Sequence, residues 1–166
     1  MTTLFSFDPG LRGTGVAVFE NKVLVACAYV RSPNKKDRGA RAWKDMGWAA
    51  HTWYHKTMDG WSPDAVAHEQ MQVYRASLQK GDPNDLLELA GVCGWVAALV
   101  GTDCKVTPYL PRQWKGQIPK DVHAKRILGR LNPNEAQVLK AEKIPKSLEH
   151  NVIDAIGIGL YHLKRV

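Results

Sequence analysis

The fold of this chain is decided at residues 4–19, LFSFDPGLRGTGVAVF, where a single carboxylate, Asp8, lies between two apolar runs. Phenylalanine and valine favour strands and the glycines favour a turn, so the stretch predicts a β-hairpin with Asp8 at the end of its first strand. Asp-Pro-Gly is also common in simple turns, and closely spaced glycines can cradle a phosphate. The choice among a turn, a phosphate site and a catalytic carboxylate depends on which other acidic residues can reach Asp8.

The rest of the chain predicts an α/β fold in a single domain, residues 1–166. A third β-rich run follows the hairpin after a short turn, which predicts three consecutive antiparallel strands. Later apolar patterns predict a helix, a strand, a helix, a strand and two more helices, with a loop at 70–84. The later strands are expected at 64–69 and 105–108, and the helices at 39–57, 84–100, 120–131 and 149–163. This order predicts a mixed five-stranded sheet with helices on both faces.

Composition excludes several classes of protein. The three cysteines, Cys27, Cys93 and Cys104, are widely spaced and lack the pairing that zinc sites show, so they are expected to be small core residues in a reducing compartment. No basic, then apolar, leader is visible, and no apolar segment comes close to the ~20 residues that a membrane helix needs. We therefore expect an intracellular, cytoplasmic protein with no membrane partner.

The net charge of +7 is concentrated in two tracts. Residues 31–44 hold six Lys or Arg and one acid, and residues 105–130 hold seven and one. Tryptophan and tyrosine residues interrupt or adjoin both tracts, a pattern that suits a nucleic-acid backbone. Ordinary solvated surface charge is the alternative explanation.

Two further acids can meet Asp8 if the sheet forms as predicted. Glu69 ends the fourth strand, which is expected to pair with the first, and Asp154 lies in an apolar stretch of the last helix, where an unpaired acid is costly to bury. Three converging carboxylates repel one another unless cations lie between them. Their oxygen atoms suit Mg²⁺ or Mn²⁺, and two such ions can hydrolyse a phosphodiester.

These residues carry a resemblance to a known family. The Asp8-Pro9-Gly10 turn followed by Thr14-Gly15, Glu69-Gln70 at a strand end, Leu89-Ala90-Gly91, residues 111–115 (PRQWK) and Asp154-Ala155 occur in an order that resembles the RuvC family of Holliday junction resolvases. The resemblance covers nearly the whole chain. It implies an RNase H-like fold, a homodimer and no nucleotide cofactor, with the host cytoplasm as its location if the gene belongs to a phage. It also implies symmetric nicking of four-way DNA junctions with two Mg²⁺ or Mn²⁺ ions, as a crossover junction endodeoxyribonuclease that leaves 5′-phosphate and 3′-hydroxyl ends.

The resemblance also implies which residues form the site. Asp8, Glu69 and Asp154 correspond to catalytic metal ligands, and Lys115 to a lysine near the scissile phosphate. The usual partner three residues before the last Asp is here Asn151, so His150, four residues before it on the same helix face, competes with Asn151 to be the fourth ligand. The predicted nucleic-acid contacts are Arg12, Tyr74, Arg75, Lys80, Arg112, Lys115 and Lys120. Tyr74 lies farther from Glu69 than the family's aromatic residue does.

Three other functions are compatible with parts of this pattern. An RNase H-like nuclease could act on branched DNA, RNA or a hybrid instead. A non-catalytic junction-binding protein is possible if Asn151 marks a lost ligand. An actin-like ATPase could use the same glycines for a nucleotide phosphate, although 166 residues leave room for only one of its two domains.

Overall fold

The structure, a computed structural model, describes residues 2–34, 36–72 and 82–166. Its strands are β1 (Thr3–Asp8), β2 (Gly13–Glu20), β3 (Val23–Arg31), β4 (Ala65–Glu69) and β5 (Lys105–Tyr109). Its helices are α1 (Gly39–Thr57), α2 (Pro83–Val100), α3 (Pro111–Trp114), α4 (Lys120–Leu128), α5 (Pro133–Ala141) and α6 (Glu149–His162). All the elements predicted from the sequence are present.

The strands form one sheet in the order β3-β2-β1-β4-β5. The first three strands are antiparallel, as the hairpin pattern predicts, and β4 and β5 join parallel to β1 and β4. In the register of β1 and β4, Phe7 lies opposite His68. Asp8 and Glu69 therefore end neighbouring strands at the same edge of the sheet.

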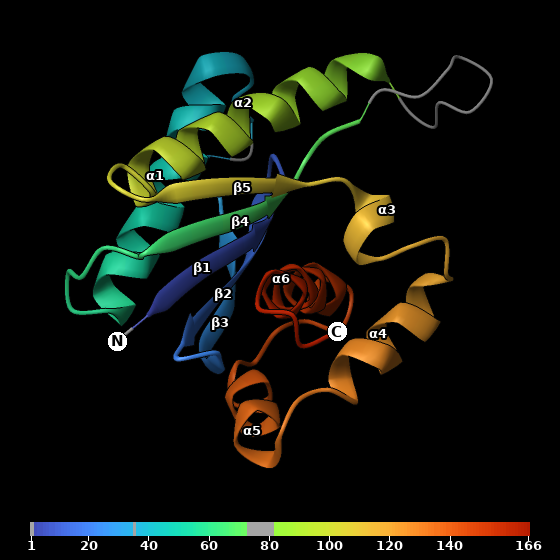
Figure 1. The fold of residues 1–166 in the computed structure, drawn as a ribbon. Helices are drawn as coiled ribbons and strands as arrows, with labels where there is room; N and C mark the ends of the chain where they lie inside the picture. Colours follow the sequence, from blue (N-terminus) through green and yellow to red (C-terminus); the bar gives the residue numbers. More distant parts are fainter. Residues whose placement is uncertain (1, 35, 73–81) are drawn as a thin grey trace.

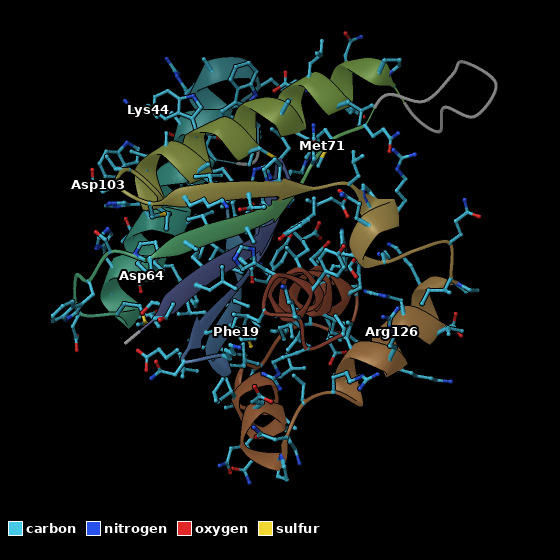
Figure 2. All side chains as sticks on the ribbon, viewed as in Figure 1. Phe19, Lys44, Asp64, Met71, Asp103 and Arg126 are labelled. Atoms are coloured by element: carbon cyan, nitrogen blue, oxygen red, sulfur yellow. The ribbon has the colours of Figure 1, made fainter. Side chains whose placement is uncertain are left out.

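Helices cover both faces of the sheet, with α1 and α2 on one face and α6 on the other (Figure 1). Alternate residues of β1 divide between two cores because side chains in a strand point to opposite faces. Phe5 and Phe7 pack with α1 and α2, whereas Leu4 packs with α6. Figure 2 labels Phe19, which fills the space beneath α6 together with other apolar side chains.

Small residues bring α1 and α2 close together. Gly91 of α2 faces the indole of Trp43 with too little room for a side chain, and Gly47 of α1 faces Trp95 in a tight contact. The 18 residues of α2 have a mean hydropathy of 1.2, which makes this helix long and apolar enough, by length and composition alone, to span a membrane. The expectation that no apolar segment reaches that length is therefore wrong for α2.

The helix α4 corrects a second expectation. The helix expected at 120–131 carries the apolar residues Val122, Ile127 and Leu128, but Val122 is 47% and Leu128 is 41% exposed. The buried residues are His123 and Ile127, which lie one turn apart on the side that faces α6. A histidine at a core position hides this face from a search for apolar periodicity.

Two helices are absent from the prediction. α3 is a single turn that begins at Pro111. α5 begins with a capping box, in which the Asn132 side chain accepts from the backbone N–H of Glu135 and the Glu135 carboxylate accepts from that of Asn132. Glu135 is fully buried, and it also accepts from the backbone N–H of Leu24 at 2.8 Å and from the guanidinium of Arg165. One carboxylate thus ties α5, β3 and the C-terminal segment together.

Candidate active site

Asp8 and Glu69 occupy the same face and the same edge of the sheet. Asp8 follows Leu4 and Ser6 in the alternation of β1, and Glu69 follows Ala67 in that of β4, so both carboxylates belong to the face covered by α6. Each acid is the last residue of its strand. Pro9 and Gly10 follow Asp8 at the end of β1, and Gln70 follows Glu69 at the end of β4. Both carboxylates lie where the apolar core beneath α6 ends.

Two contacts near Asp8 bring the helix α6 onto this edge. The backbone of Asn151 and Val152 lies so close to Gly15, the β2 partner of Asp8, that a side chain at Gly15 would collide with it. The hydroxyl of Ser6 donates to the carbonyl of Ala155 at 2.8 Å. The glycine thus serves close packing of α6 against β2, and Asp154 lies beside the residue that Ser6 holds.

Asp154 is contacted by two nitrogen atoms from other elements. Lys115, at the end of α3, donates from Nζ to Oδ2 of Asp154 at 2.8 Å. Nε2 of His123, on α4, lies 3.7 Å from Oδ1. The side chains of Asp154 and Lys115 are 13% and 16% exposed, so this ion pair is largely shielded from water.

The electrostatics of the three acids show that they act on one another. Burial, then the charges of Glu69 and Asp154, raise the pKa of Asp8 well above its ordinary value, and Lys115 and Lys120 only partly offset this. Burial raises the pKa of Glu69 to about 7, with Lys115 lowering it and Asp154 raising it. Burial lowers the pKa of His123, so its ring is neutral at pH 7. The cluster is short of positive charge.

The donor chemistry of this cluster fits a hard divalent cation. Carboxylate oxygens are the ligands that Mg²⁺ and Mn²⁺ prefer. Burial is the main cause of the raised pKa values of Asp8 and Glu69 and the neighbouring acids add to it, so a cation would favour the charged forms. Among the described residues, no three Asp, Glu, His or Cys side chains are grouped closely enough to hold one metal ion. The ammonium of Lys115 uses one lone pair of Oδ2 of Asp154, which leaves the other lone pair of this oxygen for a cation.

The other predicted site residues are placed as follows. His150 and Asn151 lie half-buried in the first turn of α6. Among the described residues, no hydrogen bond or ion pair joins either side chain to the three carboxylates. The cations predicted to contact nucleic acid are exposed: Arg12 between β1 and β2, Arg112 on α3 and Lys120 at the start of α4. Tyr74, Arg75 and Lys80 lie outside the described residues.

Three residues near Asp154 were not predicted from the sequence to be part of this site. Ser6 is a polar residue in an apolar strand, at a position where the alternation points inward, and this signal was available. His123 and Trp114 pack ring to ring, with centroids 5.0 Å apart. Nothing in their local sequence indicates that α3 and α4 fold back against α6.

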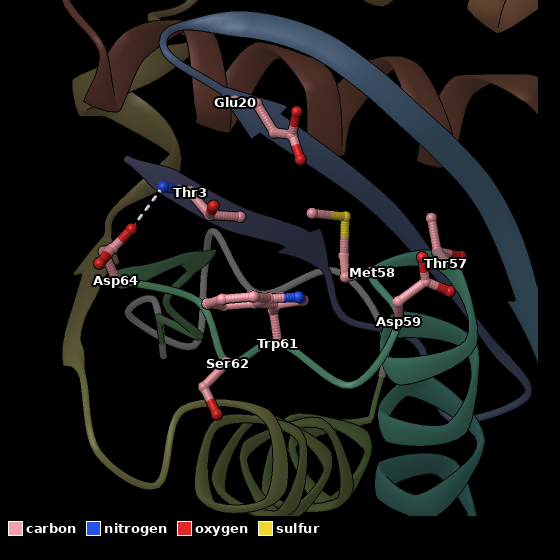
Figure 3. Close-up of a pocket in the computed structure, with 8 residues that line it drawn as sticks. All are labelled: Thr3, Glu20, Thr57, Met58, Asp59, Trp61, Ser62 and Asp64. Carbon is pink, nitrogen blue, oxygen red and sulfur yellow. Dashed lines mark hydrogen bonds between the residues drawn. The ribbon is translucent and has the colours of Figure 1, made fainter. Parts of the chain in front are cut away.

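A separate cavity of about 470 Å³ lies at the opposite end of β1 (Figure 3). Glu20, Asp64 and Trp61 help to line it, and Oδ2 of Asp64 accepts from the backbone N–H of Thr3 at 2.6 Å. Thr3 and Asp8 are separated by the length of the strand, roughly 17 Å at ~3.3 Å per residue. The cavity is therefore not part of the carboxylate cluster.

Comparisons of the whole structure identify its fold. It is similar to Thermus thermophilus RuvC in complex with a Holliday junction substrate, with a TM-score of 0.67 and 19% identity over 98% of this chain and 93% of that one. It is also similar to the yeast mitochondrial Holliday junction resolvase Ydc2, with a TM-score of 0.61 and 11% identity over 99% and 80% of the two chains. This chain has the RuvC fold.

The RuvC fold confirms the RNase H-like architecture that the sequence predicts. The sequence alone matches no family model and no curated protein. The likeness therefore lies in the arrangement of the strands and helices, which the order of the short motifs in the sequence reflects.

Proposed function

We propose that this chain is a Holliday junction resolvase, an endonuclease that nicks four-way DNA junctions symmetrically and leaves 5′-phosphate and 3′-hydroxyl ends. The proposal is supported above all by Asp8, Glu69 and Asp154, which come from three elements to one edge of a RuvC fold, and by the pKa values of Asp8 and Glu69, which burial and then the neighbouring acids raise. Lys115 and Lys120 supply the nearest compensating charge.

We assign Asp8, Glu69 and Asp154 as ligands of Mg²⁺ or Mn²⁺, with His150 as the fourth ligand and Asn151 as its competitor. Two such ions, when bound, would activate a water and stabilise the leaving oxygen of the phosphodiester. The chain itself orients the three carboxylates from rigid elements. Lys115, released from Asp154, would lie where charge develops on the phosphoryl oxygens.

We assign the DNA contacts to exposed cations around the cluster, namely Arg12, Arg112 and Lys120, together with Lys115. Lys120 begins α4 and already acts on Asp8 and Glu69 through its charge, so it is close enough to meet a phosphate at the same edge. Tyr74, Arg75 and Lys80, in the loop after Glu69, are proposed to contact the centre of the junction.

We also propose a homodimer, because two symmetric nicks need two sites related by a two-fold axis. The outer side of α2 is the candidate interface: Leu87 is 66% exposed, and a shallow hollow of about 340 Å³ is lined by Trp43, Gly91, Gly94, Trp95 and Ala98. Sedimentation of the wild type and of Leu87→Glu tests this assignment. A monomeric wild type would contradict it.

The function is tested by the rates at which the purified protein nicks a four-way junction, a linear duplex and an RNA–DNA hybrid, each with Mg²⁺ and with Mn²⁺. We expect paired nicks in the junction alone. Equal rates on the duplex or the hybrid would show an RNase H-like nuclease with another substrate. Tight junction binding without nicking in either metal would show a non-catalytic binding protein. His150→Ala and Asn151→Ala, measured in parallel, identify the fourth ligand by which of them slows the reaction.

A further inference from the structure

The interface between α4 and α6 contains one residue that its packing does not explain. His123 and Ile127 lie one turn apart on α4 and face α6. The space beside Gly157 of α6 is filled by Ile127 and the ring of Trp114, each within about 3.1 Å of where a Gly157 side chain would begin. The His123 ring, 1% exposed, packs edge to face against the same indole. An aliphatic side chain would fit this apolar setting.

The imidazole is placed there without the partners that a buried polar group needs. Neither Nδ1 nor Nε2 of His123 makes a hydrogen bond within the described structure, although both are buried. A buried polar group without a partner costs roughly 1–3 kcal/mol. The polar atom that faces the ring is Oδ1 of Asp154, 3.7 Å from Nε2, which is slightly beyond hydrogen-bond length.

The two oxygens of Asp154 are faced by nitrogens of different elements. Lys115 holds Oδ2 at 2.8 Å, and His123 faces Oδ1 from the other side. A lysine that leaves Asp154 to meet a phosphate removes the one hydrogen bond that orients this carboxylate in the described structure. The imidazole is then the group that can keep Asp154 in place, through a movement of less than about 1 Å.

We propose that His123 is a positioning residue for Asp154: its Nε2–H donates to Oδ1 and holds the carboxylate in the orientation that binds the cation. The proposal rests on the proposed metal-dependent function only for its consequence, since the contact itself exists without metal. Groups that hold a metal ligand from behind typically change metal affinity by about 10–100-fold when they are lost. His123 would therefore act on metal binding without touching metal or DNA.

The contact is tested first in the metal-free protein, by ¹⁵N NMR of the histidine rings. We expect His123 to be protonated at Nε2, with a slowly exchanging proton whose shift changes in Asp154→Asn. A ring protonated at Nδ1, or a signal indifferent to Asp154→Asn, would overturn the proposal. This measurement does not depend on whether the protein cuts DNA.

The consequence is tested by Mn²⁺ titration calorimetry of His123→Leu and His123→Gln. Leu fills the apolar site without a donor, whereas the amide of Gln can donate from nearly the same position as Nε2. We expect Mn²⁺ affinity to fall about tenfold in the Leu variant and to recover in the Gln variant. The matched control is His51→Leu on α1, on the other face of the sheet, which should bind Mn²⁺ as the wild type does.

The outcomes separate this proposal from the proposed function. A histidine that only fills space would leave the Mn²⁺ affinity of His123→Leu at the wild-type value, whatever the change in melting temperature. This result would overturn the positioning role while the wild type still nicks junctions. A wild type that does not nick any junction would overturn the function. The ring tautomer and the Mn²⁺ affinities would still decide the role of His123.

Discussion

The fully buried carboxylate of Glu135 and the partly buried carboxylates at the sheet edge behave in opposite ways. Burial disfavours the charge of Glu135, but Arg165 and the backbone N–H groups of Leu24 and Asn132 donate to it and lower its pKa to about 2. At the sheet edge, burial raises the pKa of Asp8 and Glu69, and the neighbouring acids raise that of Asp8 further. The carboxylate of Glu135 has a full set of hydrogen-bond donors, whereas the carboxylates at the sheet edge have too few donors and counter-charges.

The difference in pKa separates a carboxylate that stabilises the fold from carboxylates that do not. Glu135 stabilises the fold because every lone pair is used by groups of this chain, and it joins α5, β3 and the C-terminal segment. The carboxylates at the sheet edge oppose folding in their charged forms, and groups with raised pKa values of this kind concentrate at functional sites.

The largest effect is expected from removing charge at the sheet edge. Asp8→Asn should slow junction nicking by roughly 1,000-fold, because a bound cation supplies several kcal/mol of stabilisation to the transition state. It should also raise the free energy of unfolding of the metal-free protein, since one of three repelling charges is gone. Single-turnover nicking rates and urea unfolding in EDTA measure the two effects.

The matched change in the paired group is Glu135→Gln. It should lower stability and leave the nicking rate of the folded protein unchanged, measured well below its melting temperature. The comparison would fail if Asp8→Asn nicked at the wild-type rate or if Glu135→Gln lost nicking while folded.

The second prediction concerns the partner of Glu135. Arg165→Ala should lower the free energy of unfolding by about 3–5 kcal/mol, because it leaves a fully buried carboxylate without its counter-charge. Lys140→Ala, an exposed change on α5, is the control and should stay within about 0.5 kcal/mol. Equal stabilities of the two variants would show that Glu135 is held by its backbone donors alone.

The third prediction is a pair of opposite pH dependences in EDTA. The pKa of Glu69 is raised from 4.5 to about 7, so between those values the folded state binds more protons than the unfolded state. Its contribution to stability therefore falls as pH rises from about 4.5 to 7, by up to about 3 kcal/mol. Glu69→Gln should remove this part of the slope, and an unchanged slope would contradict the assignment.

Glu135 should give the reverse slope at lower pH. Its pKa is lowered to about 2, so its stabilisation is complete above about 4.5 and is lost as pH falls toward 2. Urea unfolding of the wild type and of Glu135→Gln between pH 2 and 5 measures it. The two curves should converge as the pH falls, and a constant gap would rule out titration of Glu135 as the cause.

The smallest effect is expected at the contact that places α6. Gly15→Ala should cost about 1–3 kcal/mol and slow nicking, because its methyl group collides with the backbone of Asn151 and moves Asp154 away from Asp8. Gln137→Ala, an exposed change on α5, is the control and should stay within about 0.5 kcal/mol. Nicking rates and thermal unfolding of both variants test the contact.

Local sequence patterns were enough to predict many of the strands and helices of this structure. The strands β1 to β3 follow from alternating apolar residues and turn glycines, whose signals lie within a few residues of one another. The helix α3 was missed because it is a single turn of four residues. The helix α5 was missed although Asn132, Pro133 and Glu135 form a start signal that the sequence shows. The buried side of α4 was misjudged because one of its two core positions is a histidine.

The sequence by itself determined that polar carboxylates end two apolar strands, because a strand's period of two and its turn residues act over short distances. It did not determine which nitrogens meet Asp154. The contacts of Ser6 with Ala155, of Gly15 with Asn151, and of Lys115 and His123 with Asp154 join residues far apart in the chain. Such contacts are set by how whole elements pack, since each depends on side chains from several segments at once. The tertiary structure alone therefore decided that His123, with no local signal of its own, faces the last carboxylate of the site.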